Sequence, residues 1–290
     1  MTMAPVTKPR GILNPQAGEG MFRLSLHPPA PDLAFFVEHY WVVTWDLRGR
    51  APYRAEILPH PCVHLVIEEG RSRVIGVMRG RFSQLLVGKG RVFGVKFRPG
   101  AFYPFMSSPV SAFTDRSLSL GAAFGADGAA VLGAMLALVD AGEMVDCADS
   151  FLRGRCPQRD ETVRVIARII DCIIARPDIT TVDGLVGRLN LNKRTVQRIF
   201  SRYVGVGPKW VIRRYRLHEA AARVAEGGRV DWPALALDLG YVDQAHFIKD
   251  FKAIVGRAPA AYAKDMGVGA VVVLGVPGAL WWPSAGVRGG

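Results

Sequence analysis

Two stretches near the end of the chain carry side chains that could form hydrogen bonds with the edges of DNA bases. Arginine and lysine can donate to O6 and N7 of guanine, and glutamine can bond to N6 and N7 of adenine. We expect these groups on two helix faces: Lys193, Arg194, Gln197, Arg198 and Arg202 on the first, and Gln244, His246, Lys249 and Lys252 on the second. An ordinary solvated helix has a similar composition, so the prediction depends on the elements that position these residues.

An internal repeat relates the two stretches. The pattern F-x4-G-x2-P occurs at residues 200–208 and again at 251–259, so each of its members is displaced by 51 residues. Upstream, Val186 and Asn190 correspond to Ala236 and Gly240 at an offset of 50, which gives the second copy one extra residue in its turn. Shared positions at one offset indicate a duplicated structural unit.

The first copy has the layout of a helix-turn-helix unit. The sequence predicts a short helix over 182–189, a turn at Asn190–Leu191, and a longer helix that is capped by Asn192 and ends near Tyr203. Asparagine adopts the left-handed backbone that such a turn requires, and its side chain accepts the free N–H groups of a following helix.

The second copy repeats this layout. Asp231 caps a helix with Pro233 in its first turn, residues 240–242 form the turn, and Asp243 caps a helix that ends near Val255. Two matched helix pairs favour DNA binding over an ordinary solvated surface.

The segment between the copies predicts one long helix over 208–226. At about 1.5 Å per residue this helix spans roughly 28 Å. Such a spacer could place two recognition helices in successive major grooves, about 34 Å apart, on one face of the duplex. The chain could then bind DNA without needing a dimer.

A second group of residues with possible chemistry lies in the first half of the chain. His60, Cys62 and His64 alternate along an expected strand, so their side chains would share a face. Imidazole and thiolate at this spacing could bind zinc or another transition metal. A buried cysteine beside hydrogen-bonded histidines is the commoner arrangement, and we expect neither a metal nor another cofactor. Trp41 and Trp45 could line an effector pocket with these three residues or belong to the core.

The first half of the chain predicts a β-rich domain. Short β-branched and aromatic runs are separated by Gly and Pro, as in a small barrel or sandwich. The runs are 40–45, 63–67, 74–78, 84–87 and 92–97, and the Ala- and Leu-rich stretch that follows predicts two helices. We expect an α+β protein with a β-rich effector-binding or dimerisation domain at 1–117, a helical connection and linker at 118–157, an all-α domain with two helix-turn-helix units at 158–265, and a tail at 266–290.

The composition fits a globular protein with a basic DNA-binding part. Of the net charge of +12, the larger share comes from residues 155–265, which hold 20 basic and 12 acidic residues. The four cysteines lack close pairing and residues 1–11 lack an apolar segment, which indicates the cytoplasm. The apolar stretch 268–282 is too short and too interrupted to cross a membrane. Because no phosphate loop, carboxylate pair or nucleophile elbow stands out, we expect no enzymatic activity.

The C-terminal residues resemble the AraC family of transcription regulators. Segments 185–192, 215–220 and 240–259 are similar to its first motif, its linker helix and its signature, within a similarity that covers about 160–264. The resemblance implies that bases are read by Arg194, Gln197 and Arg198 in the first unit and by Gln244, His246 and Lys249 in the second.

The chain departs from the family pattern at four positions. The family usually has Ala and Gly where Val186 and Asn190 stand, and Ser where Gly207 and Ala258 precede proline. These changes could loosen the first unit or weaken its binding. In the first half, segments 58–62 and 97–101 resemble a β-rich sensor-like domain found ahead of such DNA-binding units.

The resulting hypothesis is a sequence-specific transcription regulator that binds double-stranded DNA and contacts RNA polymerase. A small-molecule or protein effector would act at the first domain, where Trp41, Trp45, His60, Cys62 and His64 are the expected contacts, and a homodimer is a further possibility. One alternative is a metal-dependent cupin-like enzyme fused to a DNA-binding module, which requires His60, Cys62 and His64 to converge on a metal. Another is a DNA-binding protein with no effector.

Overall fold

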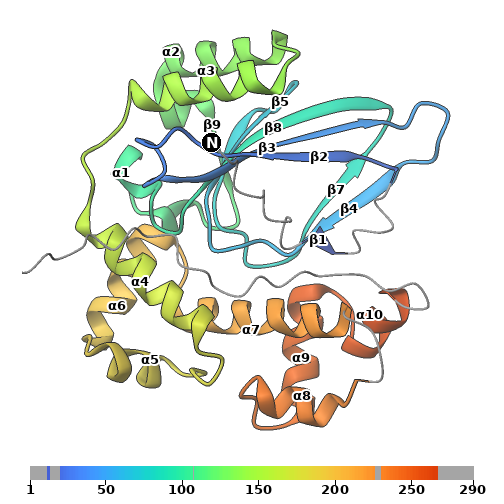
Figure 1. The fold of residues 1–290 in the computed structure, drawn as a ribbon, viewed down its shortest axis with the longest axis vertical. Coiled ribbons are helices and arrows are strands. Elements are labelled where there is room, and N and C mark those ends of the chain that lie inside the picture. The colour runs from blue at the N-terminus through green and yellow to red at the C-terminus, as the bar shows by residue number, and fades with distance from the viewer. Residues whose placement is uncertain (1–11, 14–19, 107, 226–229, 267–290) are drawn as a thin grey trace, which may run out of the picture.

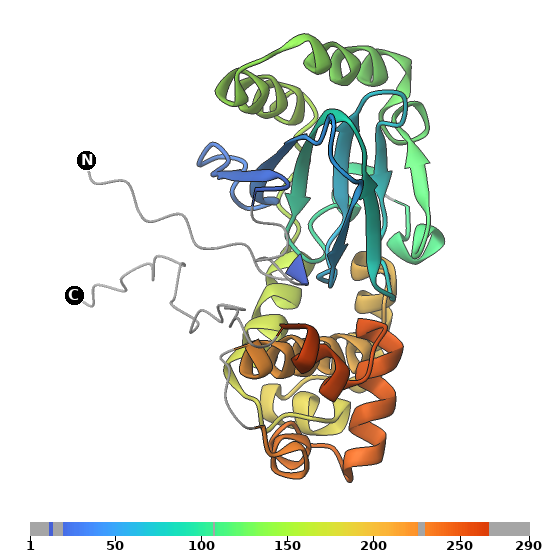
Figure 2. The same cartoon turned by 90° about the vertical axis from the view of Figure 1, so that its right-hand side faces the viewer.

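The chain folds into a β-rich domain followed by a group of helices, which is the α+β organisation expected from the sequence (Figure 1). The structure, a computed structural model, describes residues 12–13, 20–106, 108–225 and 230–266. Figure 2 shows the sheets in the upper half and the C-terminal helices in the lower half. Of the tail predicted at 266–290, residues 267–290 lie outside the described residues.

Two antiparallel sheets make up the β-rich domain. The larger has the strand order β2-β3-β8-β5-β6-β9 and the smaller the order β1-β4-β7. The strands of the larger sheet are β2 Arg23–His27, β3 Val37–Asp46, β8 Lys89–Phe97, β5 His64–Glu68, β6 Arg73–Ile75 and β9 Ser117–Ser119. Those of the smaller are β1 Ile12–Leu13, β4 Tyr53–Ile57 and β7 Phe82–Leu86. Every predicted run therefore overlaps an observed strand.

One predicted strand is shorter than expected. The run 74–78 forms only β6, which ends at Ile75. At Gly76 the chain passes Phe113, whose carbonyl oxygen would lie only 2.1 Å from a Cβ at this position. Phe113 ends the short helix η1 (Val110–Phe113), so a segment distant in sequence terminates the strand.

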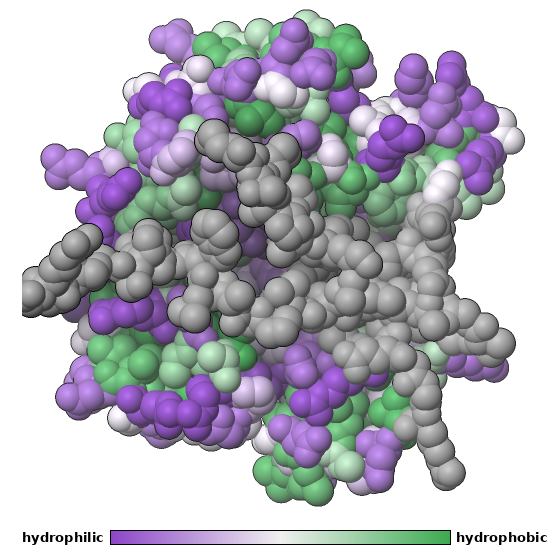
Figure 3. All heavy atoms as spheres, in the orientation of Figure 1, coloured by the Kyte–Doolittle hydropathy of each residue, from purple (hydrophilic) through white to green (hydrophobic). Residues whose placement is uncertain are grey.

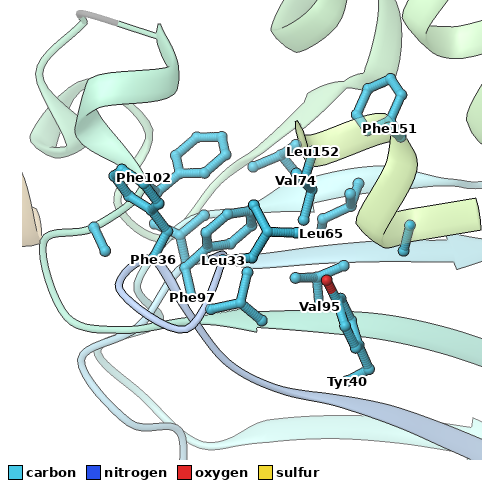
Figure 4. Close-up of a cluster of buried hydrophobic side chains, with 14 of the residues drawn as sticks. Leu33, Phe36, Tyr40, Leu65, Val74, Val95, Phe97, Phe102, Phe151 and Leu152 are labelled. Carbon is cyan, nitrogen blue, oxygen red and sulfur yellow. The ribbon is translucent and has the colours of Figure 1, made fainter. Parts of the chain in front are cut away.

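Helices cover one face of the larger sheet and form the main core with it (Figure 4). The strand residues Tyr40, Leu65 and Val95 are fully buried in one cluster with Phe151 and Leu152. These last two residues belong to α3 (Ala141–Arg153), which Asp140 caps by accepting from the N–H groups of Gly142 and Glu143. With α2 (Leu120–Ala134), this confirms the two helices expected in 118–152 and places them against the sheet (Figure 1).

The stretch Leu120–Ala137 is long and apolar enough to cross a membrane by length and composition alone, and 22% of it is buried. Its helix is interrupted at Gly125, where φ is 76° and ψ is 175°. Leu132 and Met135 from this stretch are 0% exposed in the core of the β-rich domain. The buried residues of the stretch thus pack into this core, whereas most of the stretch is not buried.

The opposite face of the larger sheet carries the predicted tryptophans. Trp41 pairs with Gly94 and Trp45 with Gly90 in the register of β3 and β8. A Cβ at either glycine would lie within 2.2 Å of the indole opposite it. The glycines of β8 thus leave room for two half-buried indoles, which lie outside the main core.

The C-terminal domain follows the predicted order of helices. These are α4 Glu161–Ala175, α5 Val182–Leu189, α6 Lys193–Ile199, the π-helical turn η3 Phe200–Val204, α7 Pro208–Ala225, α8 Trp232–Asp238, α9 Gln244–Val255 and α10 Pro259–Met266. The long helix α7 belongs to two cores. Val211 and Ile212 pack with α4 to η3, whereas Leu217 and Ala221 pack with α8 to α10. One helix therefore joins the two predicted units.

Candidate nucleic-acid interface

The first helix-turn-helix unit consists of α5 and α6, and its turn has the geometry that the sequence predicts. Asn190 adopts the left-handed conformation, with φ 51° and ψ 49°. The side chain of Asn192 accepts from the N–H group of Thr195 at 3.1 Å, which caps α6. Val196 and Phe200 are buried on the inner side of the recognition helix.

The conformation of Asn190 leads to a prediction about stability. The Asn190→Ala variant should lose about 1 kcal/mol of unfolding free energy, because alanine tolerates the left-handed region less well. The Asn190→Gly variant should equal or exceed the wild type, because glycine adopts this conformation without strain. Urea denaturation of both proteins measures the difference. Equal stabilities of the two variants would contradict the prediction.

The second unit, α8 and α9, repeats the arrangement. Asp231 caps α8 by accepting from Ala234, and Asp243 caps α9 by accepting from the N–H group of His246 at 2.7 Å. Gly240 forms the turn with φ 75°, and a Cβ there would lie 1.8 Å from Thr180 Cγ2. The turn glycine therefore allows close packing against the segment before α5.

Most of the predicted base-reading residues are on the outer sides of α6 and α9. Arg194, Gln197 and Arg198 are exposed, and so is Lys193, whose Nζ lies 2.7 Å from Asp183 Oδ1. On α9, Lys249 and Lys252 are exposed and Gln244 is half-buried. The side chain of His246 is 54% exposed and lies 3.7 Å from Asp250 Oδ2.

Arg202 is placed differently from the other predicted readers. Its Nε donates to the hydroxyl of Tyr103 at 2.5 Å, and its guanidinium lies 4.9 Å from the centre of that ring. Tyr103 belongs to α1 (Tyr103–Met106) of the β-rich domain. In this arrangement Arg202 connects the two domains.

Two arginines of the long helix α7 hold the domain together. Arg213 forms an ion pair with Asp250 of α9. Arg216, which is 4% exposed, donates from Nη2 to the carbonyl groups of Ile173 and Arg176 at the end of α4. Burial lowers the pKa of Arg216, although the nearby Glu219 and Asp178 oppose this effect. From its sequence alone α7 would be a charged surface helix. In the structure, Arg213 binds α9 and Arg216 binds the end of α4.

The two recognition helices lie along one side of the C-terminal domain. In Figure 2, α6 with η3 (gold) and α9 (orange-red) are both on the right-hand edge, and in Figure 1 they are separated along the direction of α7. Hydrophobic surface gathers at the lower end of the molecule, around α8 (Figure 3). The exposed Leu237 and Val242 lie in α8 and in the turn that follows it.

Both recognition helices end against the β-rich domain. Gly205 and Gly256, the equivalent glycines of the repeat, end η3 and α9 in the left-handed region, with φ 92° and 87°. The carbonyl of Gly205 accepts from the hydroxyl of Thr114 at 2.7 Å, and a Cβ at Gly256 would lie 2.9 Å from the guanidinium carbon of Arg81. Next to Gly256, Arg257 donates to Glu56 at 2.5 Å. The sequence repeat identified these glycines, but it did not indicate what they contact.

The predicted set of His60, Cys62 and His64 is arranged differently from expectation. Only His64 lies in a strand, because β5 begins there, so the prediction of three alternating strand residues was wrong. Pro59 and Pro61 account for the irregular backbone, in which the N–H group of Cys62 donates to the carbonyl of His60.

These three side chains contact different neighbours. The His60 ring stacks on His218 of α7 at 4.4 Å, whereas the His64 ring lies 6.3 Å from Trp41. Burial raises the pKa of the Cys62 thiol to about 12, so the thiolate is disfavoured. Within the described ranges, no group of three or more His, Cys, Asp or Glu side chains is arranged to hold a metal ion. The geometry therefore gives no support to the alternative of a metal-dependent enzyme.

Comparison with known proteins divides the chain into two matching regions. Residues 25–119 match the model of a domain of unknown function, DUF6597, and residues 185–265 match the model of a helix-turn-helix domain. No curated protein matches the chain significantly.

Several solved structures are similar to the chain. The C-terminal domain of the response regulator yesN from Fusobacterium nucleatum is 20% identical, with 36% of this chain and 99% of that one covered and a TM-score of 0.31. The DNA-binding domain of AdpA, solved in complex with a target DNA, is 22% identical over 37% and 93%, with a TM-score of 0.30. ToxT from Vibrio cholerae is 12% identical over 86% and 95%, with a TM-score of 0.36.

The match to the helix-turn-helix model coincides with the two capped helix pairs and the helix that joins them. Residues 185–265 therefore form a helix-turn-helix domain of the AraC type, and the chain is a DNA-binding transcription regulator that carries this domain behind a β-rich domain of the DUF6597 family.

Proposed function

We propose that both helix-turn-helix units bind one DNA site, each with its recognition helix in one of two successive major grooves. The placement of α6 and α9 along one side of the domain carries this proposal (Figure 2). The 18 residues of α7 fix their separation. At about 1.5 Å per residue α7 spans roughly 27 Å, which is comparable to the groove repeat of about 34 Å. Arg194, Gln197 and Arg198 then contact one half-site, and Gln244, His246 and Lys249 contact the other.

The second part of the proposal is that the β-rich domain controls this binding in response to an effector. The hydrogen bond from Thr114 to Gly205 and the ion pair of Glu56 with Arg257 support it, because they connect the β-rich domain to the end of each recognition helix. A ligand that alters these contacts between the β-rich domain and the recognition helices would change which relative arrangement of the two helix-turn-helix units is the more stable. Bound at a promoter, the regulator acts on RNA polymerase, and a second copy of the chain is a further expected partner.

Footprinting on selected DNA tests the two-groove model. Genomic fragments that bind the purified chain are isolated, and the strongest site is probed with hydroxyl radicals. We expect two protected segments about 10 base pairs apart on one face of the duplex. Binding should also weaken steeply with added salt, because phosphate contacts release counterions. A single protected segment, or binding that does not distinguish sequences, would contradict the proposal.

A further inference from the structure

One edge of the β-rich domain lies beside the ends of both recognition helices. The hydroxyl of Thr114 donates to the carbonyl of Gly205 after η3, and Arg81 lies against Gly256 after α9. In Figure 2, η1 and β9 (light green) stand on the right-hand edge, which is also the edge of α6 and α9. This part of the β-rich domain is therefore next to the DNA that the two helices would bind.

An open hollow marks the contact at the first unit. Its volume is about 460 Å³, and its lining consists of Arg79, Ser111, Ala112, Thr114, Arg116 and Gly205. Two guanidinium groups and two hydroxyl-bearing side chains make this lining polar and basic. Such a lining suits an anion with several oxygen atoms better than an apolar ligand.

Asp115 orders one of the two arginines. Its carboxylate accepts from the backbone N–H group of Arg79 at 2.6 Å and from Arg79 Nε at 2.5 Å. Asp115 has a left-handed backbone with φ 59°, which residues other than glycine rarely adopt, and its N–H group donates to the carbonyl of Val77. The side chain of Arg79 is still 64% exposed. The two segments that line the hollow are thus bound to each other, and Arg79 remains accessible.

Arg116 is the second arginine of the hollow. Its backbone is fixed, because its N–H group donates to the carbonyl of Phe113 and its carbonyl accepts from Gly76. Its side chain is exposed and forms no hydrogen bond or ion pair with any described residue. Arg79 and Arg116 together with the one carboxylate of Asp115 leave one positive charge in excess beside the end of the first recognition helix.

The second unit has the same balance of charge. Arg81 of the β-rich domain and Arg257, which follows α9, both pair with Glu56. Here too, two guanidinium groups share one carboxylate. The end of each recognition helix is therefore accompanied by one positive charge in excess, and arginines of the β-rich domain contribute to both.

We propose that the β-rich domain itself binds the DNA backbone, with Arg79 and Arg116 contacting a phosphate beside the groove that α6 enters. Guanidinium groups form charge-assisted hydrogen bonds with phosphate oxygens, and such contacts position a protein on DNA without reading its sequence. A free anion would match the same charge. DNA is favoured over a free anion because the neighbouring recognition helix brings its phosphates to this edge.

This inference rests on the proposed two-groove model and extends the DNA interface beyond the helix-turn-helix domain. It also gives the domain contact a consequence. The phosphate contact depends on the position of the β-rich domain, which the hydrogen bond from Thr114 to Gly205 helps to fix. A movement of the β-rich domain away from Gly205 would weaken binding to all DNA sequences alike, because a backbone contact carries no base preference.

The salt dependence of DNA binding tests this contact. Affinities of the full chain for its operator and for an unrelated duplex of equal length are measured between about 50 and 200 mM salt. The proteins are the wild type, Arg116→Ala, Arg116→Lys and Arg23→Ala. Arg23 is exposed on β2, at the opposite edge of the larger sheet from β9, and serves as the matched control.

We expect Arg116→Ala to bind both duplexes about 3- to 10-fold more weakly. The slope of log affinity against log salt should become shallower by about 1, because one phosphate contact is lost. Arg116→Lys should keep the wild-type slope, since it keeps the charge, and Arg23→Ala should behave as the wild type. All four proteins should fold, because neither arginine is buried.

Ethylation interference locates the phosphate. Ethylation removes the negative charge of single phosphate groups in the operator, so it weakens binding where the protein contacts them. We expect one sensitive phosphate beside the half-site of α6 in the wild type, and we expect this sensitivity to be absent in Arg116→Ala. If Arg116 served a free anion instead, the variant would keep the wild-type interference pattern, which would contradict the proposal.

Three further outcomes would overturn the contact. They are an unchanged slope in Arg116→Ala, an equal change of slope in Arg23→Ala, and a loss of affinity for the operator alone. The two-groove model is judged separately by its footprint. Two protected segments with an unchanged slope in Arg116→Ala would support that model and contradict the phosphate contact. A single protected segment with a shallower slope in Arg116→Ala would contradict the model and still support a contact between the β-rich domain and DNA.

Discussion

The Phe251→Ala variant is expected to lose about 3–5 kcal/mol of unfolding free energy. Phe251 is 0% exposed and lies between Phe247 and Tyr262, each with its ring centre 5.6 Å away. The substitution removes a ring from a closed core, so both buried apolar area and packing contacts are lost. Urea denaturation followed by circular dichroism measures the change.

The internal repeat provides a second variant for this experiment. Phe200 occupies the equivalent position in the first unit and is also 0% exposed, so Phe200→Ala should have a similar effect. Leu237→Ala is the control, because Leu237 is 63% exposed and its truncation should change stability by less than about 0.5 kcal/mol. A loss below about 1 kcal/mol in both phenylalanine variants would show that these units do not depend on the cores described here.

The second large effect concerns DNA affinity. Replacing both Arg194 and Gln197 by alanine should cost about 1–3 kcal/mol for each bidentate base contact that is lost, and base preference should relax in one half-site only. Both side chains are exposed on α6, so the fold should remain intact. Competition titrations with operator variants measure the affinity and the preference at each base.

Arg202→Ala is the matched control for the reader variant. Arg202 is on the same recognition segment, but its Nε donates to Tyr103 of the β-rich domain. We expect its removal to leave base preference unchanged. If the Arg194 and Gln197 double variant kept its operator affinity and preference, the assignment of these two residues as readers would be wrong.

The helix-turn-helix units were predictable because their signals are local. Asn192 and Asp243 cap the helices that they were expected to cap, and Asn190 adopts the predicted left-handed turn. A cap or a turn depends on a few neighbouring residues, so a single sequence contains the necessary information. The same reasoning gave the bounds of α5 and of α9.

The contacts of the arginines were not predictable in the same way. Arg202, Arg214 and Arg216 have the residue type of a DNA-facing surface, but their partners are 37 to 155 positions away in the sequence. Likewise, alternation over 60–64 suggested a strand, although two prolines leave only His64 within β5. Tertiary packing determines the partners of these arginines and the backbone of residues 60–64. No periodicity in the sequence predicts such packing.

The placement of Gly205 and Gly256 has a consequence for how perturbations spread. Gly205 directly follows η3 and Gly256 directly follows α9, so each lies at the end of a predicted recognition helix, and both lie against the β-rich domain, at Thr114 and at Arg81. A movement of the β-rich domain as a unit would therefore disturb both recognition helices at once. Substitutions at Thr114 and Arg81 should therefore be energetically non-additive in their influence on operator occupancy, even though the two side chains serve different halves of the DNA-binding domain.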